Sequence, residues 1–426
     1  MKKILVRGPA LTRSGYGEHT RFILRSLKSR EDLFDIYLIP INWGKTGWIY
    51  DDTEERRWLD FIIAKTAIYN QQQQSQYDMS MQVTIPNEWE KIAPINIGVT
   101  AGIETTRVAP LWIEKGNLVD KIITISEFSK NTYKDTVYTI TDNGTGQVVN
   151  QDFRCTTPIT AVHYPVRETE IKEIDLNLTT DFNFLVTAQW SPRKNIENTI
   201  AWFIEEFIDQ EVGLIIKINI VNNSLIDRHE TEKRIKNIID HYPQKKCKIY
   251  LLHGDLTAAE MNSLYCHDKI KALISLAHGE GFGLPTFEAA YNGMPVIAAD
   301  WSGHTEFLYK QTKNKKGKIK NKPHFARVDY DIAPVQKEVI WKDVLIKDSM
   351  WCYPKQGSYK LRLREVYKDY GRFKLQALKL KEYICDTFTS EAKYKEVVDI
   401  VKSSFPENLD DQEIDSMFEK LMAQNS

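Results

Sequence analysis

Short apolar runs recur along the chain, and several are followed by a stretch whose apolar residues return every three or four positions. The clearest runs occupy residues 3–7, 35–40, 94–100, 120–126, 182–188, 213–221, 247–253, 272–276 and 295–299. Runs of this length are typical of strands that are buried on both faces of a parallel sheet. Between two of them, Ile196, Ile200, Phe203 and Phe207 form a single helical stripe. The alternation of strands and helices predicts an α/β fold with doubly wound parallel sheets.

The order strand, loop, helix begins twice, which predicts two domains. A first strand leads into a loop with Gly15 and Gly17, and a second such start follows at residues 182–188. We therefore expect an N-terminal Rossmann-like domain over residues 1–166 and a second one over 167–400, whose polar start serves as the linker. A chain of 426 residues is long enough for two full cores.

Residues 137–149 interrupt the α/β rhythm of the first domain. Asn143 and Gly144 stand there between two β-prone runs. An Asn-Gly pair in this setting is a strong signal for a β-hairpin. We expect an inserted hairpin, whose function the sequence does not indicate.

The segment from residue 272 to 300 carries the clearest chemical signal. An apolar run is followed by Gly279, Gly281 and Gly283, and Pro285 and Gly293 then bracket a short helix. This pattern predicts a strand, a glycine loop, a helix and a further strand. It places Glu280 in the loop and Glu288 in the first turn of the helix.

Glycines before a helix leave its backbone N–H groups open to a phosphate. The spacing here is G-x-G-x-G and not the G-x-G-x-x-G of dinucleotide folds. A carboxylate suits a sugar, because its two oxygens accept hydrogen bonds from neighbouring hydroxyls. Two carboxylates beside a phosphate-binding turn therefore indicate a nucleotide-sugar ligand. The alternative is that the glycines only turn the chain and both acids face water.

The segment His278–Ala289, HGEGFGLPTFEA, resembles the glutamate-pair signature of the retaining glycosyltransferases of family 4. The resemblance implies the GT-B fold, with two Rossmann-like domains facing each other across a cleft. It also implies that a C-terminal helix, here at residues 401–426, packs back on the N-terminal domain. In such an enzyme Glu288 would hold the ribose and Glu280 the transferred hexose. The N–H groups near Gly281, Phe282, Gly283 and Leu284 would meet the diphosphate.

Two cations precede the helix of the second domain. Arg193 and Lys194 add positive charge to a helix start that already favours anions. Lys194 aligns with the diphosphate-gripping lysine of the family that the chain resembles. The family's arginine position falls on Gln189, which is a departure, and Arg193 is the candidate to replace it. A plain solvated charge pair is the alternative.

Three further strand ends match the resemblance by position. Glu104 stands where the family places a polar residue facing the transferred sugar, although it is equally suited to capping a loop. His253 and Gly254 occupy the turn whose backbone meets the nucleotide base, and His253 is also suited to a structural role. Gly15 and Gly17 match the loop over the diphosphate and acceptor, or form a simple turn.

The composition excludes several classes of protein. The net charge of −1 gives no global field toward nucleic acid or membrane, and five scattered cysteines without CxxC spacing argue against disulfides and zinc. We expect a cytoplasmic location, no cofactor and no metal site. Residues 310–322 hold seven lysines. This segment is either a solvated loop or a contact for an anionic acceptor, a phospholipid surface or nucleic acid. Membrane contact is otherwise not indicated, and a specific nucleic-acid partner is not expected.

The sequence as a whole predicts a retaining, metal-independent hexosyltransferase. It would move a hexose from a UDP- or GDP-sugar to a hydroxyl of a glycan, a lipid-linked glycan or a protein. Glu280, Glu104 and Lys194 are the catalytic candidates. A non-catalytic nucleotide-sugar-binding protein is one alternative, supported by Gln189. A nucleotide-dependent oxidoreductase is another, but its glycine spacing is absent from the first turn.

Overall fold

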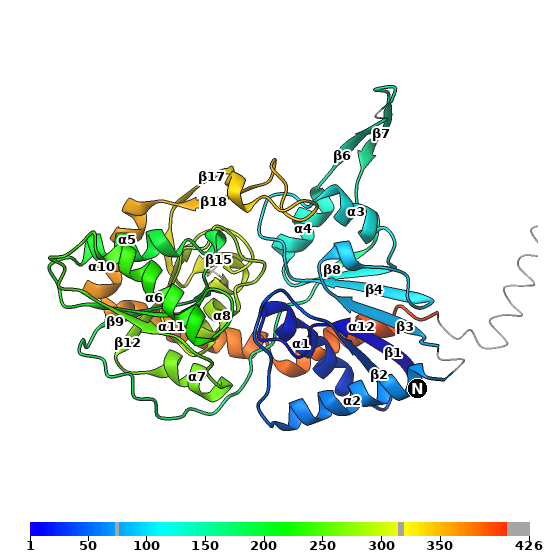
Figure 1. The fold of residues 1–426 in the computed structure, drawn as a ribbon, viewed down its shortest axis with the longest axis horizontal. Coiled ribbons are helices and arrows are strands. Elements are labelled where there is room, and N and C mark those ends of the chain that lie inside the picture. Colours follow the sequence, from blue (N-terminus) through cyan, green and yellow to red (C-terminus); the bar gives the residue numbers. More distant parts are fainter. Residues whose placement is uncertain (73–75, 143, 314–318, 407–426) are drawn as a thin grey trace, which may run out of the picture.

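The computed structural model describes residues 1–72, 76–142, 144–313 and 319–406. Within these ranges the chain forms two parallel sheets with helices packed against each, side by side in Figure 1. The α/β fold with parallel sheets is confirmed. Asn143 of the predicted hairpin turn, residues 314–318 of the lysine-rich segment and residues 407–426 lie outside the described residues.

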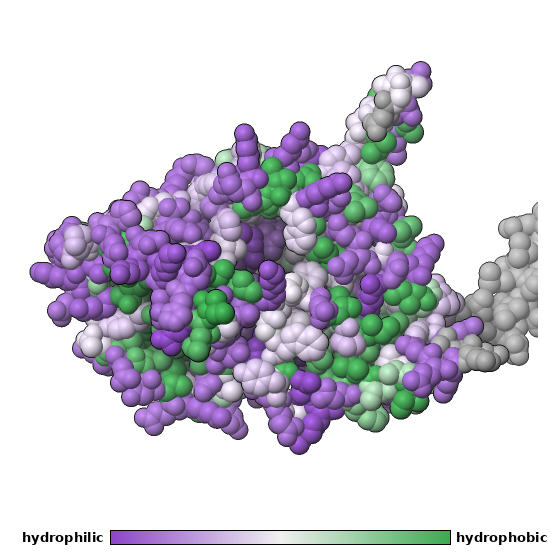
Figure 2. Space-filling model, in the orientation of Figure 1, coloured by the Kyte–Doolittle hydropathy of each residue, from purple (hydrophilic) through white to green (hydrophobic). Residues whose placement is uncertain are grey.

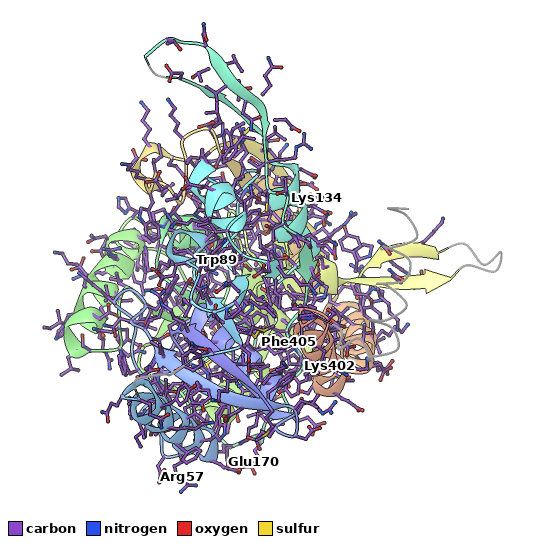
Figure 3. All side chains as sticks on the ribbon, turned by 90° about the vertical axis from the view of Figure 1, so that its right-hand side faces the viewer. Arg57, Trp89, Lys134, Glu170, Lys402 and Phe405 are labelled. Atoms are coloured by element: carbon purple, nitrogen blue, oxygen red, sulfur yellow. The ribbon has the colours of Figure 1, made fainter. Side chains whose placement is uncertain are left out.

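The first sheet has the strand order β2-β1-β3-β4-β5-β8, and each pair of neighbouring strands in it is parallel. Its strands are β1 (Lys2–Gly8), β2 (Phe34–Pro40), β3 (Met79–Val83), β4 (Ile95–Thr100), β5 (Lys121–Thr124) and β8 (Ile159–Ala161). The helical segments of this part are α1 (Gly15–Lys28), α2 (Glu54–Asn70), η1 (Pro86–Glu88), α3 (Pro110–Gly116) and α4 (Glu127–Asp135). Trp89, labelled in Figure 3, is fully buried and packs on Gly98 of β4, where a side chain would overlap its ring.

The second sheet has the order β11-β10-β9-β12-β13-β16 and is parallel throughout its pairings. Its strands are β9 (Asn183–Gln189), β10 (Gly213–Asn219), β11 (Lys248–Leu252), β12 (Ile270–Ser275), β13 (Val296–Ala299) and β16 (Ala326–Val328). The helical segments here are η2 (Pro192–Lys194), α5 (Ile196–Glu206), α6 (Leu225–Ile239), α7 (Ala258–Cys266), α8 (Leu284–Tyr291), α9 (Thr305–Leu308) and α10 (Gln356–Lys368). The predicted stripe of α5, which continues into Phe207, is buried as expected.

An antiparallel hairpin lies in the segment where the insertion was predicted. β6 (Tyr138–Thr141) and β7 (Val148–Phe153) pair antiparallel and project from the first domain in Figure 1. A second hairpin, β14 (Tyr309–Lys313) with β15 (Ile319–Pro323), carries the ends of the lysine-rich segment and projects sideways in Figure 3.

A bridging segment, residues 335–349, was not predicted. It lies between β17 (Tyr330–Pro334) and β18 (Met350–Pro354), contains η3 (Lys337–Val339), and crosses to the first domain along the upper edge of Figure 1. Asn87 Nδ2 donates to the Asp343 carbonyl at 2.9 Å, and Arg107 pairs with Asp348 at 3.2 Å. Figure 2 shows a hollow between the two domains just below this bridge.

The chain returns to the first domain through α11 (Tyr370–Thr387) and α12 (Ser390–Lys402). α12 packs against α1, and Lys121 Nζ donates to Ser403 Oγ at 2.8 Å. Lys402 and Phe405 mark this end in Figure 3. The returning helix α12 ends at Lys402, and most of the C-terminal helix predicted over 401–426 lies outside the described residues. No helix in the described ranges is long and apolar enough to cross a bilayer.

Candidate active site

Glu280 is the centre of a charged cluster in the loop that follows β12. Glu280 is buried, and its carboxylate accepts hydrogen bonds from Lys194 Nζ and, at 3.0 Å, from Arg193 Nη1. Arg193 Nη1 also donates to the Gly279 carbonyl at 2.7 Å. Both cations belong to η2, directly after β9, which is the strand next to β12 in the sheet. Neighbouring parallel strands end at the same sheet edge, and this brings the two loops together.

The cations decide the charge state of Glu280. Burial by itself would raise the pKa of the carboxyl, but Lys194 and Arg193 outweigh it and lower the pKa to about 2. Burial in turn lowers the pKa of Lys194, although Glu280 opposes this. Glu280 is therefore a firmly ionised acceptor near neutral pH.

Glu104 brings a third element, from the other domain, into this cluster. It follows β4 of the first sheet, and its carboxylate lies 3.7 Å from Arg193 Nη2. Burial raises the pKa of Glu104, and Arg193 opposes that shift. Glu104, Arg193, Lys194 and Glu280, which the sequence singled out separately, thus meet at one point between the two sheets.

The glycines beside Glu280 serve the contact between the domains. A side chain at Gly279 would place its Cβ 2.1 Å from the Glu104 carbonyl oxygen, and one at Gly281 would lie 2.1 Å from that of Ala101. Neither overlap is relieved by a side-chain rotation, because both oxygens belong to the backbone. The sequence analysis assigned these glycines to phosphate access. The structure shows that they also let the two domains approach.

Helix α8 begins one residue earlier than predicted. Gly283 is its N-cap with φ +88°, and Leu284 is its first residue, so Glu288 lies one turn inside the helix and not in the first turn. The Glu288 carboxylate accepts a hydrogen bond from Tyr265 Oη of α7 at 2.9 Å. Burial raises the pKa of Glu288 to about 7, against the effect of that hydrogen bond.

The side chain of Phe282 belongs to the core. It is 3% exposed and packs against Phe287 and Phe307.

Gln189 takes no part in the cluster. Its exposed side chain donates to the Ile220 carbonyl at 3.0 Å, at the end of β10. The guanidinium in the cluster is that of Arg193. Asn195 stands at the N-cap of α5 with a left-handed backbone, φ +54°, and without a side-chain cap hydrogen bond. Its amide donates instead to the Leu276 carbonyl at 3.3 Å.

His253 has a structural partner. Its Nε2 lies 2.8 Å from Asp227 Oδ2, and its side chain is only 3% exposed, so only its backbone faces outward. The next residue, Gly254, has φ +124°, and its carbonyl accepts from Lys217 Nζ at 2.7 Å. Lys217 was not predicted, since a single lysine inside a strand pattern gives no sequence signal.

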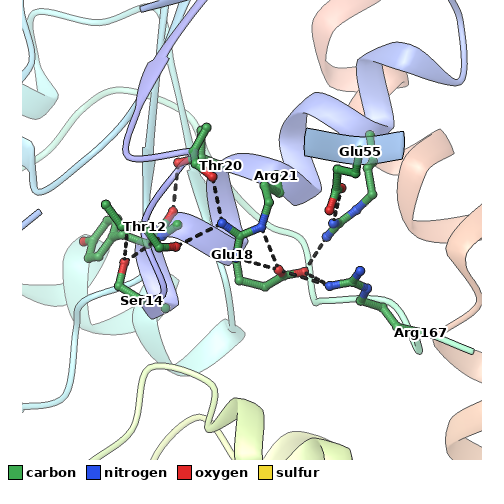
Figure 4. A network of polar contacts seen from close by, with 12 residues as sticks. Thr12, Ser14, Glu18, Thr20, Arg21, Glu55 and Arg167 are labelled. Atoms are coloured by element: carbon green, nitrogen blue, oxygen red, sulfur yellow. Dashed lines mark hydrogen bonds and ion pairs between the residues drawn. The ribbon is translucent and has the colours of Figure 1, made fainter. Parts of the chain in front are cut away.

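The loop before α1 is held from within the first domain (Figure 4). Arg21 Nη1 donates to the carbonyls of Ala10 at 2.7 Å and Thr12 at 3.0 Å. The Glu18 carboxylate accepts from Arg21 and from Arg167 of the linker.

Gly17 of this loop has no room for a Cβ, which would lie 2.1 Å from the Thr12 carbonyl oxygen, whereas Gly15 has open space around it. The loop is therefore held by contacts within the protein at Gly17, while Gly15 is open.

Glu306 of α9 is a residue that the sequence analysis missed. Its carboxylate accepts from the backbone N–H groups of Glu127 at 2.9 Å and Phe128 at 2.7 Å, at the start of α4 in the first domain. It also lies 2.6 Å from His163 Nε2. A carboxylate at a helix N-terminus is favourable by charge and by hydrogen bonding. Glu306 therefore fastens the second domain to the first.

Within the described ranges no group of three or more His, Cys, Asp or Glu side chains is arranged to hold a metal ion.

The chain is similar to known proteins in part of its sequence and in its fold. No protein-family model matches the chain. Over 121 residues, 28% of its length, the chain is 31% identical to the serotype-specific mannosyltransferase WbdA of Escherichia coli, and it spans only 13% of that relative.

Among solved structures, it resembles sucrose-phosphate synthase of Thermosynechococcus elongatus over 95% of this chain and 99% of that one, with a TM-score of 0.61 and 12% identity. It also resembles Anabaena Alr3699/HepE in complex with UDP and glucose, over 95% and 100% of the two chains, with a TM-score of 0.54 and 12% identity. The chain thus has the GT-B fold of these glycosyltransferase neighbours, with its charged cluster between the two domains.

Proposed function

We propose that this protein is a retaining glycosyltransferase of family 4, which moves a hexose from a nucleoside-diphosphate sugar to a hydroxyl acceptor. The observation that carries the proposal is the position of Arg193, between Glu280 of its own domain and Glu104 of the other. A carboxylate pair on either side of a phosphate-binding cation suits a ligand with a sugar and a diphosphate. The match to a mannosyltransferase and the fold shared with UDP- and glucose-bound HepE support the same class.

The donor would lie on the second domain, residues 167–400. Glu280 is ionised and would accept hydrogen bonds from hexose hydroxyls, in place of those it now accepts from Lys194 and Arg193. The two cations would then turn to the diphosphate, together with the N–H groups of Gly283 and Leu284 at the start of α8.

The ribose and the base of the nucleotide would also lie on the second domain. Glu288 and its partner Tyr265 would meet the ribose, and the backbone at His253 and Gly254 would meet the base. The acceptor would enter from the first domain, residues 1–166, where Glu104 reaches the cluster.

The chemistry follows from this placement. As the bond between the sugar and the phosphate breaks, negative charge grows on the nucleoside diphosphate. Lys194 and Arg193 would stabilise that charge, because they are already fixed and partly shielded from water. Contact between the domains at Gly279 and Gly281 would exclude water, which limits hydrolysis of the activated sugar.

One assay tests the proposal. The purified protein is incubated with UDP-, GDP- and ADP-hexoses, with and without glycan acceptors, and the released nucleotide is measured with and without EDTA. We expect release from one donor class, unaffected by EDTA, and a product whose anomeric configuration in NMR equals that of the donor. Tight donor binding without release would instead favour the non-catalytic binding protein.

A further inference from the structure

A cavity beside the loop that carries Arg193 and Lys194 is lined by none of the four residues of the charged cluster. Its volume is about 360 Å³, the space of roughly twelve water molecules. This is too large for an ion and falls within the range of small-molecule sites. Four separate segments form its wall: the loop and first turn of α5, the residue before Gly279, the bridging segment, and Tyr353 of β18. The cavity therefore exists only in the folded arrangement of these segments.

The wall contributed by α5 and the bridging segment is rich in hydrogen-bonding groups and carries negative charge. Glu197 and Glu338 contribute carboxylates, and Asn198 and Gln336 contribute amides. Glu197 accepts from Trp190 Nε1 through one oxygen, while Glu338 has no side-chain hydrogen bond or ion pair to the described part of the chain.

The amide oxygen of Gln336 is buried and has no hydrogen-bond partner among the described residues. A buried acceptor of this kind is unfavourable unless a ligand or water satisfies it.

The remaining wall is aromatic. Tyr353 donates its hydroxyl to the Pro334 carbonyl at 2.7 Å, which fixes the ring beside the cavity. His278 donates from Nδ1 to the Cys352 carbonyl at 2.6 Å, and its ring is stacked on Trp351 at 4.9 Å between centroids. Burial lowers the pKa of His278 and so favours the neutral ring, and with its proton on Nδ1 the second nitrogen, Nε2, is an acceptor.

These features select the class of ligand. Among the described residues no lysine or arginine lines the cavity, so a phosphate or carboxylate would meet like charge there. A hydrophobic ligand would leave the acceptors of Glu338 and Gln336 unpaired. A neutral polyol offers many O–H donors to these acceptors, and the apolar face of a sugar ring fits an aromatic side chain.

We propose that the cavity is a second carbohydrate subsite, which binds a neutral hexose residue of the acceptor glycan beside the donor site. The assignment to the acceptor rests on the proposed function: a glycan that enters from the first domain would extend to this cavity, whose lining residues all belong to the second domain. The loop from Pro192 to Asn195 separates the two sites and contributes to both, since Lys194 reaches Glu280 while Pro192 and Asn195 line the cavity. The bridging segment thereby supplies specificity for the acceptor.

The test measures sugar binding by the full-length protein in the presence of UDP. Methyl α-D-mannopyranoside, methyl α-D-glucopyranoside, α-mannobiose and maltose are the probes, followed by saturation-transfer NMR. Two variants alter the cavity: Glu338→Ala removes an exposed carboxylate without a fold contact, and Asn198→Trp fills the space. Lys337→Ala is the matched control, because Lys337 neighbours Glu338 but does not line the cavity.

We expect at least one probe to bind the wild type, and both cavity variants to weaken that binding by about tenfold or more, the equivalent of one good hydrogen bond. The control should bind as the wild type does. Release of nucleotide from the donor in the absence of acceptor should be unchanged in all three variants.

The proposal is overturned if no probe binds the wild type, or if Glu280→Ala abolishes binding while both cavity variants retain it. The latter result would place the sugar in the donor site. A wild type that binds the probes through the cavity but turns over no nucleotide-sugar would contradict the proposed function and leave the carbohydrate subsite standing.

Discussion

Arg193 of the second domain lies between two carboxylates, 3.0 Å from Glu280 and 3.7 Å from Glu104 of the first domain. Both carboxylates raise the pKa of the guanidinium against the effect of burial, so Arg193 stays charged. A lysine in its place has one ammonium and cannot reach Gly279 and both acids together. We expect Arg193→Lys to lower kcat/KM by about tenfold or more, the loss of one charge-assisted hydrogen bond. The change in kcat/KM would be measured by steady-state kinetics with the nucleotide-hexose that proves to be the donor. Unchanged kinetics would show that Arg193 has no role in the reaction.

Lys194→Ala should abolish transfer while the protein stays folded. The variant loses the cation nearest to Glu280 and, in the proposed mechanism, a contact to the leaving diphosphate. Losing one such preorganised group typically lowers kcat by roughly 10²–10³-fold. Circular dichroism and nucleotide release would be measured together. Lys355→Ala, which breaks an exposed ion pair with Asp331, is the control, and wild-type turnover by Lys194→Ala would contradict the mechanism.

The raised pKa of Glu288 predicts a pH dependence for nucleotide binding. If the ribose hydroxyls bind the ionised carboxylate, affinity for the nucleotide should rise as the pH increases through about 7 and level off above 8. Titration calorimetry in buffers of different ionisation enthalpy would show a proton released on binding near pH 6.5. Glu288→Gln should bind more weakly at pH 8 and without this dependence. An affinity that is flat from pH 6 to 8 in the wild type would contradict the assignment.

The same carboxyl gives a stability prediction of definite sign. Because the folded-state pKa of Glu288 is raised, its ionisation destabilises the fold, fully so above pH 7 and not at all below about 4.5. Glu288→Gln should therefore increase the free energy of unfolding at pH 8, by on the order of 1–3 kcal/mol, and leave it unchanged at pH 4. Urea unfolding at the two pH values checks this, and equal effects at both would show that ionisation is not the cause.

Gly281→Ala should separate the domains. Its Cβ would overlap the Ala101 carbonyl oxygen at 2.1 Å, so the loop and the first domain cannot keep their present contact. We expect loss of transfer and an increased radius of gyration in small-angle X-ray scattering. Gly357→Ala in α10 is the control, since no atom lies within 4 Å of its added Cβ. An active, equally compact Gly281→Ala protein would show that the contact is not needed.

Glu306→Ala should weaken the fastening between the domains. It leaves the first N–H groups of α4 and His163 without their partner, a change that costs about 1–2 kcal/mol for a charged helix cap. We expect a higher KM for the donor and a larger share of hydrolysis, because water enters an open cleft more readily. Glu306→Gln keeps one acceptor oxygen and should fall between the alanine variant and the wild type. If both variants match the wild type, closure does not depend on Glu306.

The sequence alone determined the local features that repeat a known physical pattern. Buried parallel strands need continuous apolar runs, and helices packed on a sheet need apolar residues along one face. Both patterns are visible in the sequence, so the α/β architecture could be predicted. The hairpin could be predicted because Asn-Gly between two β-prone runs is a strong turn signal. The connection is nevertheless longer than a two-residue turn, because β6 ends at Thr141 and β7 begins at Val148. The order of strand, glycine loop and helix around Glu280 and Glu288 could be predicted because the glycines, the proline and the acids are close together in the chain.

Only the tertiary structure decided how distant segments meet. Glu104, Arg193 and Glu280 are separated by about 90 residues at each step, and nothing in local spacing fixes their distance. Glu306 reads in sequence as an ordinary helix acid, and the bridging segment as loop, yet each binds the other domain. Gly279 and Gly281 suggested a phosphate turn, and their lack of a side chain also serves a backbone contact between domains. Contacts of this kind depend on the packing of two sheets, which no single stretch of the chain encodes.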